Sequence, residues 1–185
     1  MRTARCRLPA AGDLGDNMKA FVAGFVTCVV LAIAGAVGYS YSGVQNIAAA
    51  VPDNPALAWL LHNTYDHSLD RAAAGVTVPA NLETPEAVRA GAKIYNDECI
   101  YCHGAPGEEM TGLAKGLNPP APVLLAARRH NEPGETFWVV KNGVRMSAMP
   151  AWGKSYDDAR IWSVAAFLHQ KHGISVADYK ALTGD

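Results

Sequence analysis

Two cysteines and a histidine stand in the spacing Cys-x-x-Cys-His, at Cys99, Cys102 and His103. Two thiols spaced in this way reach the two vinyl groups on one porphyrin edge, and the adjoining imidazole then lies under the iron. A reduced thiol pair and half of a zinc site use the same Cys-x-x-Cys spacing. Zinc would need a second pair of ligands, but the other cysteines, Cys6 and Cys28, lie far upstream. The motif therefore favours covalent attachment of one haem c.

A loop further along the chain supplies candidates for the second axial ligand of the iron. Met149 is followed by Pro150, and Met146 lies three residues earlier. A histidine–methionine pair suits an electron-transfer haem, because the thioether raises the reduction potential. Proline fixes the backbone next to Met149. Met146 is the competing thioether, with packing at the rim of the pocket as its other role. We favour Met149.

Together these motifs resemble those of the class I c-type cytochromes, in which a Met-Pro pair in a loop before the last helix carries the sixth ligand. The resemblance implies that His103 and Met149 ligate the iron. It also implies one haem c, bound covalently through Cys99 and Cys102. A carbonyl in the proline-rich segment 104–125 is then expected to accept a hydrogen bond from the Nδ1–H of the histidine, and the choice among its prolines stays open.

Four further side chains are weighed for a role at the haem. We nominate Arg145 and Trp152 to meet the haem propionates, through charge and through indole N–H donation. A surface cation and a packing aromatic are the alternative interpretations of these two residues. His62 and His67 lie on the polar face of a predicted helix, so we expect solvated side chains there instead of iron ligands.

The elements that position these residues are predicted to be helical. Thr84-Pro85-Glu86 is typical of a helix start, and the helix runs into the haem motif. In class I cytochromes a glycine on this helix lets the C-terminal helix cross closely, and Gly91 and Tyr95 match that half of the arrangement. Residues 157–170 carry an apolar face at helical spacing and match the other half. The fold class is therefore all-α, a small cytochrome c haem domain with an N-terminal transmembrane helix.

Two stretches lie between these helices. Residues 104–125 are rich in glycine and proline, which predicts no regular secondary structure. Residues 133–142 predict a short helix with an apolar face, ended by Asn142-Gly143. The sixth ligand is expected in the loop that follows this short helix.

An uncharged apolar run covers residues 20–39, and twenty helical residues cross a hydrocarbon core of about 30 Å. It is preceded by four cations, Arg2, Arg5, Arg7 and Lys19. By the positive-inside rule the N-terminus lies in the cytoplasm. The alternative is a cleaved signal peptide, with small residues at 34–36 for the peptidase. The run is longer than the roughly 7–15 apolar residues that a signal peptide needs, so we favour a retained anchor.

The chain is thus predicted to have four parts. These are a cytoplasmic segment over 1–19, a transmembrane anchor over 20–39, a juxtamembrane linker with a short helix over 40–80, and the haem domain over 81–185. The helix in the linker is expected over 56–74, and Met18 is an alternative start to Met1. We expect a single-pass protein of the bacterial cytoplasmic membrane with its haem domain on the periplasmic side, where the family resemblance implies that haem is attached.

Charge and motif content narrow the function. From Ser40 onward there are 12 Lys and Arg against 15 Asp and Glu, a balance of −3. No broad basic surface favours nucleic acid, and long-range steering toward a partner would be weak. The sequence shows no paired carboxylates, no nucleophile with a base and no phosphate loop. We therefore expect no enzymatic activity by this chain alone and no small-molecule substrate.

The predicted function is single-electron transfer between redox proteins of a respiratory or dehydrogenase chain. One alternative is a haem subunit of a respiratory oxidase or dehydrogenase complex. A weaker alternative is a haem sensor or peroxidase whose methionine leaves the iron.

Overall fold

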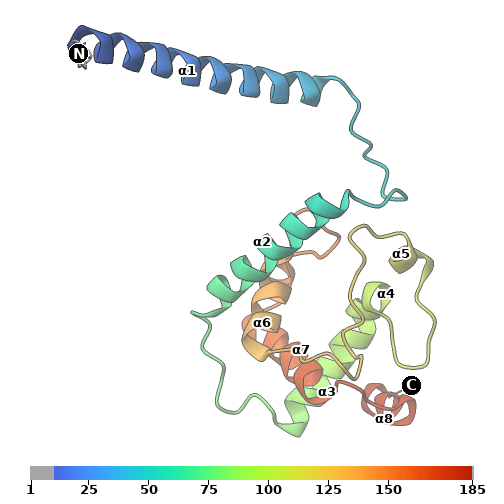
Figure 1. Cartoon of the computed structure of the whole chain (residues 1–185). Helices are drawn as coiled ribbons and strands as arrows, with labels where there is room; N and C mark the ends of the chain where they lie inside the picture. The colour runs from blue at the N-terminus through green and yellow to red at the C-terminus, as the bar shows by residue number, and fades with distance from the viewer. Residues whose placement is uncertain (1–10, 185) are drawn as a thin grey trace, which may run out of the picture. The chain divides into compact units, whose positions relative to one another are not determined.

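The computed structural model describes residues 11–184, and all regular secondary structure within them is helical (Figure 1). The predicted all-α fold class is confirmed. The chain divides into two compact units, Met1–Ala48 and Ala49–Asp185. The three arginines behind the orientation argument, and Cys6, lie outside the described residues.

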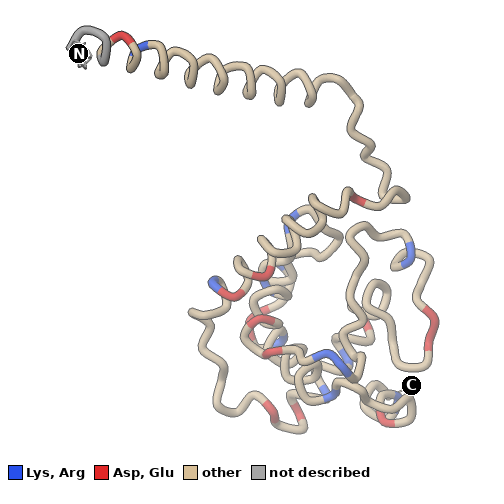
Figure 2. Tube along the Cα trace, in the orientation of Figure 1, with Lys and Arg blue, Asp and Glu red and all other residues tan. Residues whose placement is uncertain are grey.

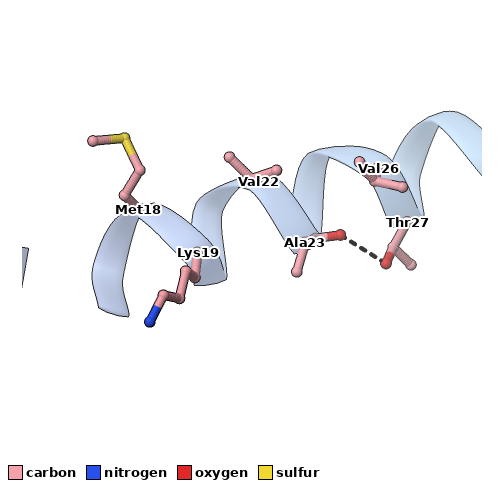
Figure 3. A pocket seen from close by; sticks show the side chains of 6 residues that line it. All are labelled: Met18, Lys19, Val22, Ala23, Val26 and Thr27. Atoms are coloured by element: carbon pink, nitrogen blue, oxygen red, sulfur yellow. Dashed lines mark hydrogen bonds between the residues drawn. The ribbon is translucent and has the colours of Figure 1, made fainter. Parts of the chain in front are cut away.

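The first unit contains one long helix, α1 (Ala11–Tyr41). Its segment Gly15–Tyr41, of 27 residues, is long and apolar enough to cross a membrane by length and composition. Its charged side chains stand only near its beginning, and the rest is uncharged (Figure 2). The hydroxyl of Thr27 donates to the carbonyl of Ala23 at 2.8 Å, so this polar group is satisfied within the helix (Figure 3). The helix extends beyond the predicted 20–39 at both ends.

In the second unit, three short helical pieces follow one another into the haem motif. These are α3 (Pro85–Ile94), a π-helical turn η1 (Tyr95–Cys99) and α4 (Ile100–His103). The predicted start is confirmed, because the Thr84 hydroxyl accepts a hydrogen bond from the Ala87 amide at 3.2 Å. The π-helical turn ends at Cys99, and α4 continues directly from it to His103. The turn therefore sets how Cys99 is rotated about the helix axis relative to Cys102 and His103.

Helix α7 (Asp158–Gln170) crosses α3 at close range, as predicted. A Cβ on Gly91 would lie 1.9 Å from the carbonyl oxygen of Ser163, so only glycine allows this approach. The rings of Tyr95 and Phe167, both fully buried, pack with centroids 5.5 Å apart. The crossing therefore joins the helix that leads into the haem motif to the main core of the unit.

The remaining elements complete the second unit. They are α2 (Pro55–Ala73), α5 (Gly112–Lys115), α6 (Pro133–Asn142), the 3₁₀ turn η2 (Trp152–Lys154) and α8 (Val176–Thr183). Helix α6 has the predicted bounds. The prediction of no regular structure over 104–125 is wrong at α5, whose first turn is capped by the Thr111 hydroxyl. Helix α2 packs against α6, so the compact unit begins at residue 49 and includes much of the predicted linker.

Candidate haem site

His103 is the last residue of α4 and is buried, with 9% of its surface exposed. Its Nδ1 lies 2.7 Å from the carbonyl oxygen of Pro122. Because a carbonyl can only accept, Nδ1 carries the proton and Nε2 is the nitrogen left to bind a metal. The expected carbonyl partner in the proline-rich segment is thus Pro122. Burial lowers the pKa of His103, and the bond to Pro122 opposes that shift, so the ring is neutral and ready to ligate.

The turn behind the histidine is held by Tyr95 and Gly104. Gly104 has a φ of 76°, a left-handed conformation that favours glycine, and it ends the short helix. Its carbonyl accepts a hydrogen bond from the Tyr95 hydroxyl at 2.8 Å. Sequence reasoning placed Tyr95 at the helix crossing, but it missed this bond to the turn.

Cys99 and Cys102 lie on the same turn, and both are half-buried. Burial, and then the neighbouring Glu98, raise the pKa of a free Cys99 thiol to about 12. A redox-active thiol pair or a zinc site needs thiolate at neutral pH, which this environment disfavours. Among the described residues no group of three or more His, Cys, Asp and Glu side chains is placed to hold a metal ion. The raised pKa of Cys99 therefore argues against a role as a redox-active or zinc-bound thiolate.

The loop after α6 presents its two methionines differently. Met149 is half-buried and packs against the cluster of Phe137, Val140, Ile161 and Ala165. Met146 is 90% exposed and has a φ of 61°. Met149 is therefore the methionine whose side chain packs against the apolar interior.

Short-range contacts shape this loop. The Ser147 hydroxyl donates to the Val144 carbonyl at 2.8 Å and accepts from the Met149 amide at 3.1 Å. Gly143 has a φ of 69°, and a Cβ there would lie 2.9 Å from the Met149 carbonyl oxygen. From the sequence, Gly143 is predicted only to end the preceding helix. The structure shows that it also lets the Met149 segment close over it.

A hydrogen bond links the methionine side of the site to the cysteine motif. The Tyr156 hydroxyl donates to Glu98 at 2.6 Å, and Glu98 directly precedes Cys99. Tyr156 also stacks on Trp152, with centroids 5.5 Å apart and planes 9° from parallel. Tyr156 and Glu98 were not predicted as part of the site.

The other nominated residues are placed as follows. Trp152 is half-buried in the cluster that holds Met149, whereas Arg145 is exposed. His62 and His67 are exposed on α2, and His62 lies 3.5 Å from Asp66. These positions fit the expectation that the two histidines are solvated.

The residues present fit a haem c. A buried neutral imidazole with its Nδ1 occupied follows directly on two half-buried cysteines, and a thioether is held at a second apolar cluster. The helical fold and the match of part of the chain to a cytochrome family show a c-type cytochrome domain. Residues 86–168 match the protein family described as cytochrome c oxidase, cbb3-type, subunit III.

Two curated proteins similar to this chain carry the name Cbb3-type cytochrome c oxidase subunit CcoP. The protein from Azospirillum brasilense is 33% identical over 89 residues, which cover 47% of this chain and 29% of the relative. The protein from Azospirillum sp. (strain B510) is 35% identical over 88 residues, which cover 46% of this chain and 29% of the relative. The matched part thus spans less than a third of either relative. No solved structure matches this chain significantly.

Proposed function

We propose that this chain transfers single electrons through one covalently bound haem c, as a cytochrome subunit that serves a respiratory oxidase. The single observation that carries the proposal is the Cys-x-x-Cys-His turn whose buried histidine is oriented by the Pro122 carbonyl. The similar proteins are named as oxidase subunits, which favours a place in such a complex over a freely diffusing carrier. Partners are then the redox proteins of a respiratory chain.

In this proposal Nε2 of His103 and the sulfur of Met149 would bind the iron, and Cys99 and Cys102 would hold the porphyrin. The haem supplies a metal that changes oxidation state by one electron. With both ligand positions taken by side chains, the iron would bind no substrate, so the chain would act in electron transfer and would not itself be an enzyme. The apolar clusters under Met149 and around Cys99 keep water away and limit reorganisation between the two oxidation states.

We further propose that α1 is a retained anchor with the chain's start in the cytoplasm, so that residues 49–185 lie outside the cytoplasmic membrane. Lys19 stands at the beginning of the apolar span, in keeping with the positive-inside rule. Tyr39 and Tyr41 lie at its other end, where interfacial aromatics belong.

The test begins with the full chain, expressed in a host that attaches c-type haem and extracted from its membranes. Intact mass should show one haem per chain, and the pigment should stay with the protein in acidified acetone. A redox titration should fit one reversible one-electron step. Release of the pigment into acetone would contradict covalent attachment, and hence the proposal.

A second measurement separates an oxidase subunit from a free carrier. The chain carrying an affinity tag is isolated from gently solubilised membranes of its own source. We expect cytochrome c oxidase activity to elute with it in a constant ratio across a size-exclusion profile. If the haem protein elutes alone and all oxidase activity elutes elsewhere, the chain is a free electron carrier and not an oxidase subunit.

A further inference from the structure

The beginning of α2 is apolar on all sides and uncovered. Residues 55–61, with the sequence PALAWLL, carry no polar side chain, and all seven are exposed. Trp59 is 68% exposed, and Leu60 is 52% exposed. A helix that is apolar all round is normally buried. The second half of α2 is polar and supplies all of the helix's half-buried side chains, among them Tyr65 and Leu69.

The directions of these side chains indicate what kind of surface covers them. Successive residues of an α-helix are about 100° apart, so Leu57 and Leu60 lie about 60° apart on one side of the axis, whereas Trp59 lies about 160° from Leu57 and about 100° from Leu60. Apolar side chains therefore stand on two widely separated sides of the helix. A single groove on a partner protein would cover one side of the helix only. Immersion in a fluid apolar layer covers all the sides that face away from the protein's own domain.

The chain between α1 and α2 is also exposed and nearly uncharged. Residues 42–54 are all exposed and include the apolar side chains of Val44, Ile47 and Val51. Between Lys19 and Asp66 the only Asp, Glu, Lys or Arg is Asp53, so the uncharged composition of the membrane helix continues into α2 (Figure 2). The linker is thus poor in charge, although it contains the polar side chains of Ser42, Gln45, Asn46 and Asn54.

The exposed start of α2 is a fixed part of the second unit. The helix packs against α6, and the Val51 carbonyl accepts a hydrogen bond from the Asn118 amide at 3.4 Å. The Asn54 side chain caps the helix by accepting from the Ala56 amide at 2.9 Å. The apolar surface is therefore held in place by the domain and is not a frayed end.

We propose that residues 55–61 insert into the interface of the bilayer that α1 spans, and so hold the haem domain against the membrane surface. The inference rests on the anchoring by α1 proposed above. The 13 residues 42–54 reach at most about 45 Å when extended, so α2 begins within that distance of the end of α1. Such a tether gives a weak apolar contact a high effective concentration. The indole of Trp59 suits an interface, where its N–H stays near water.

The experiment uses the full haem-loaded chain, one per nanodisc of phosphatidylcholine and phosphatidylglycerol. With Cys6→Ala and Cys28→Ala, a single nitroxide probe is placed through Leu60→Cys, and in a control through Lys180→Cys on α8. Collisions with a water-soluble nickel chelate are measured at both positions. We expect the probe at 60 to meet the chelate at least about threefold less often than the probe at 180, as for a side chain below the headgroups.

A matched pair of variants distinguishes insertion of residues 55–61 into the bilayer from a position that is merely near the bilayer because of the linker. Leu57→Ser with Trp59→Ser, in the Leu60→Cys chain, should restore access of the chelate to the level seen at position 180. Asn63→Ser with His67→Ser, on the polar part of the same helix, should leave access low. An unchanged low access in the first variant would overturn the proposal.

Two other outcomes are equally decisive. Equal access at positions 60 and 180 in the unaltered helix would mean that water covers the surface in the isolated chain, and would overturn membrane insertion in favour of a protein partner. Co-flotation of the chain with lipid vesicles tests α1 separately. If the chain floats and position 60 is water-exposed, the α2 proposal alone fails. If the chain does not float, the anchor fails as well.

Discussion

His103 and Met149, the two proposed axial ligands, are held by different means. His103 ends a helix, is buried, and has one nitrogen bound to the Pro122 carbonyl. Met149 lies in an irregular loop shaped by Ser147 and Gly143, and it is only half-buried. The histidine position follows from helical register and covalent spacing. The methionine position depends on weaker contacts, so we expect it to be the more easily disturbed of the two.

The largest expected effect comes from removing the proposed loop ligand. Met149→Ala should abolish the red charge-transfer band of methionine–ferric iron, while the two thioether bonds and His103 remain. Met146→Ala is the matched control, because that side chain is 90% exposed, and it should leave the band intact. Absorption spectroscopy of the oxidised protein near neutral pH measures both. Loss of the band in the Met146 variant alone would reverse the ligand assignment.

We expect the position of His103 to change only when the packing of α3 against α7 is disrupted. Gly91→Ala places a Cβ against the Ser163 carbonyl, where neither backbone can yield. We expect a loss of about 3 kcal/mol or more in the free energy of unfolding, at the upper end of overpacking costs. Gly112→Ala in α5 has nothing within 4 Å and should change stability little. Denaturant titration of the haem-loaded protein measures both, and equal stability of the two variants would contradict the close crossing.

A third substitution tests the loop without touching the methionine. Gly143→Ala combines a left-handed φ of 69° with contacts under 3 Å to Met149 and Pro150. We expect a cost of about 1–3 kcal/mol and a weakened or shifted methionine band, because the loop must move. The Soret band and covalent attachment should be kept. An unchanged methionine band would mean that the loop position does not depend on Gly143.

The difference between features set by local sequence and features set by long-range contacts also explains which parts of the structure the sequence predicts. Helices α3, α6 and α7 follow from caps and periodicity within one segment, and these predictions agree with the structure. Helix α8 was missed because it is eight residues long and buries only Tyr179. The choice of Pro122 among the prolines depends on how a loop folds back on α4. The pair of Tyr156 and Glu98 joins positions 58 apart in the chain, which no local pattern reveals.

The smallest expected effect concerns Tyr95, which braces the histidine turn. Tyr95→Phe leaves the Gly104 carbonyl without its partner, which should cost about 1–2 kcal/mol at pH 7. Burial raises the pKa of this phenol above its ordinary value of 10. The unfolded chain therefore loses the proton first as the pH rises, and the stability due to the neutral phenol, complete below pH 10, declines above it.

For the protein with Tyr95, this group alone should lower the free energy of unfolding by about 1.4 kcal/mol per pH unit above pH 10. The phenylalanine variant lacks that contribution, so the difference between the two proteins should shrink and then change sign at high pH. Urea titrations between pH 7 and 11 measure it, with Tyr41→Phe as the control, because that side chain is 88% exposed in the chain alone. If the free energy of unfolding of the two proteins depends on pH in the same way, the Tyr95 hydroxyl is not buried against the turn that ends at Gly104. The turn that positions His103 would then lack this stabilising bond, which would weaken the contrast with the loosely held Met149.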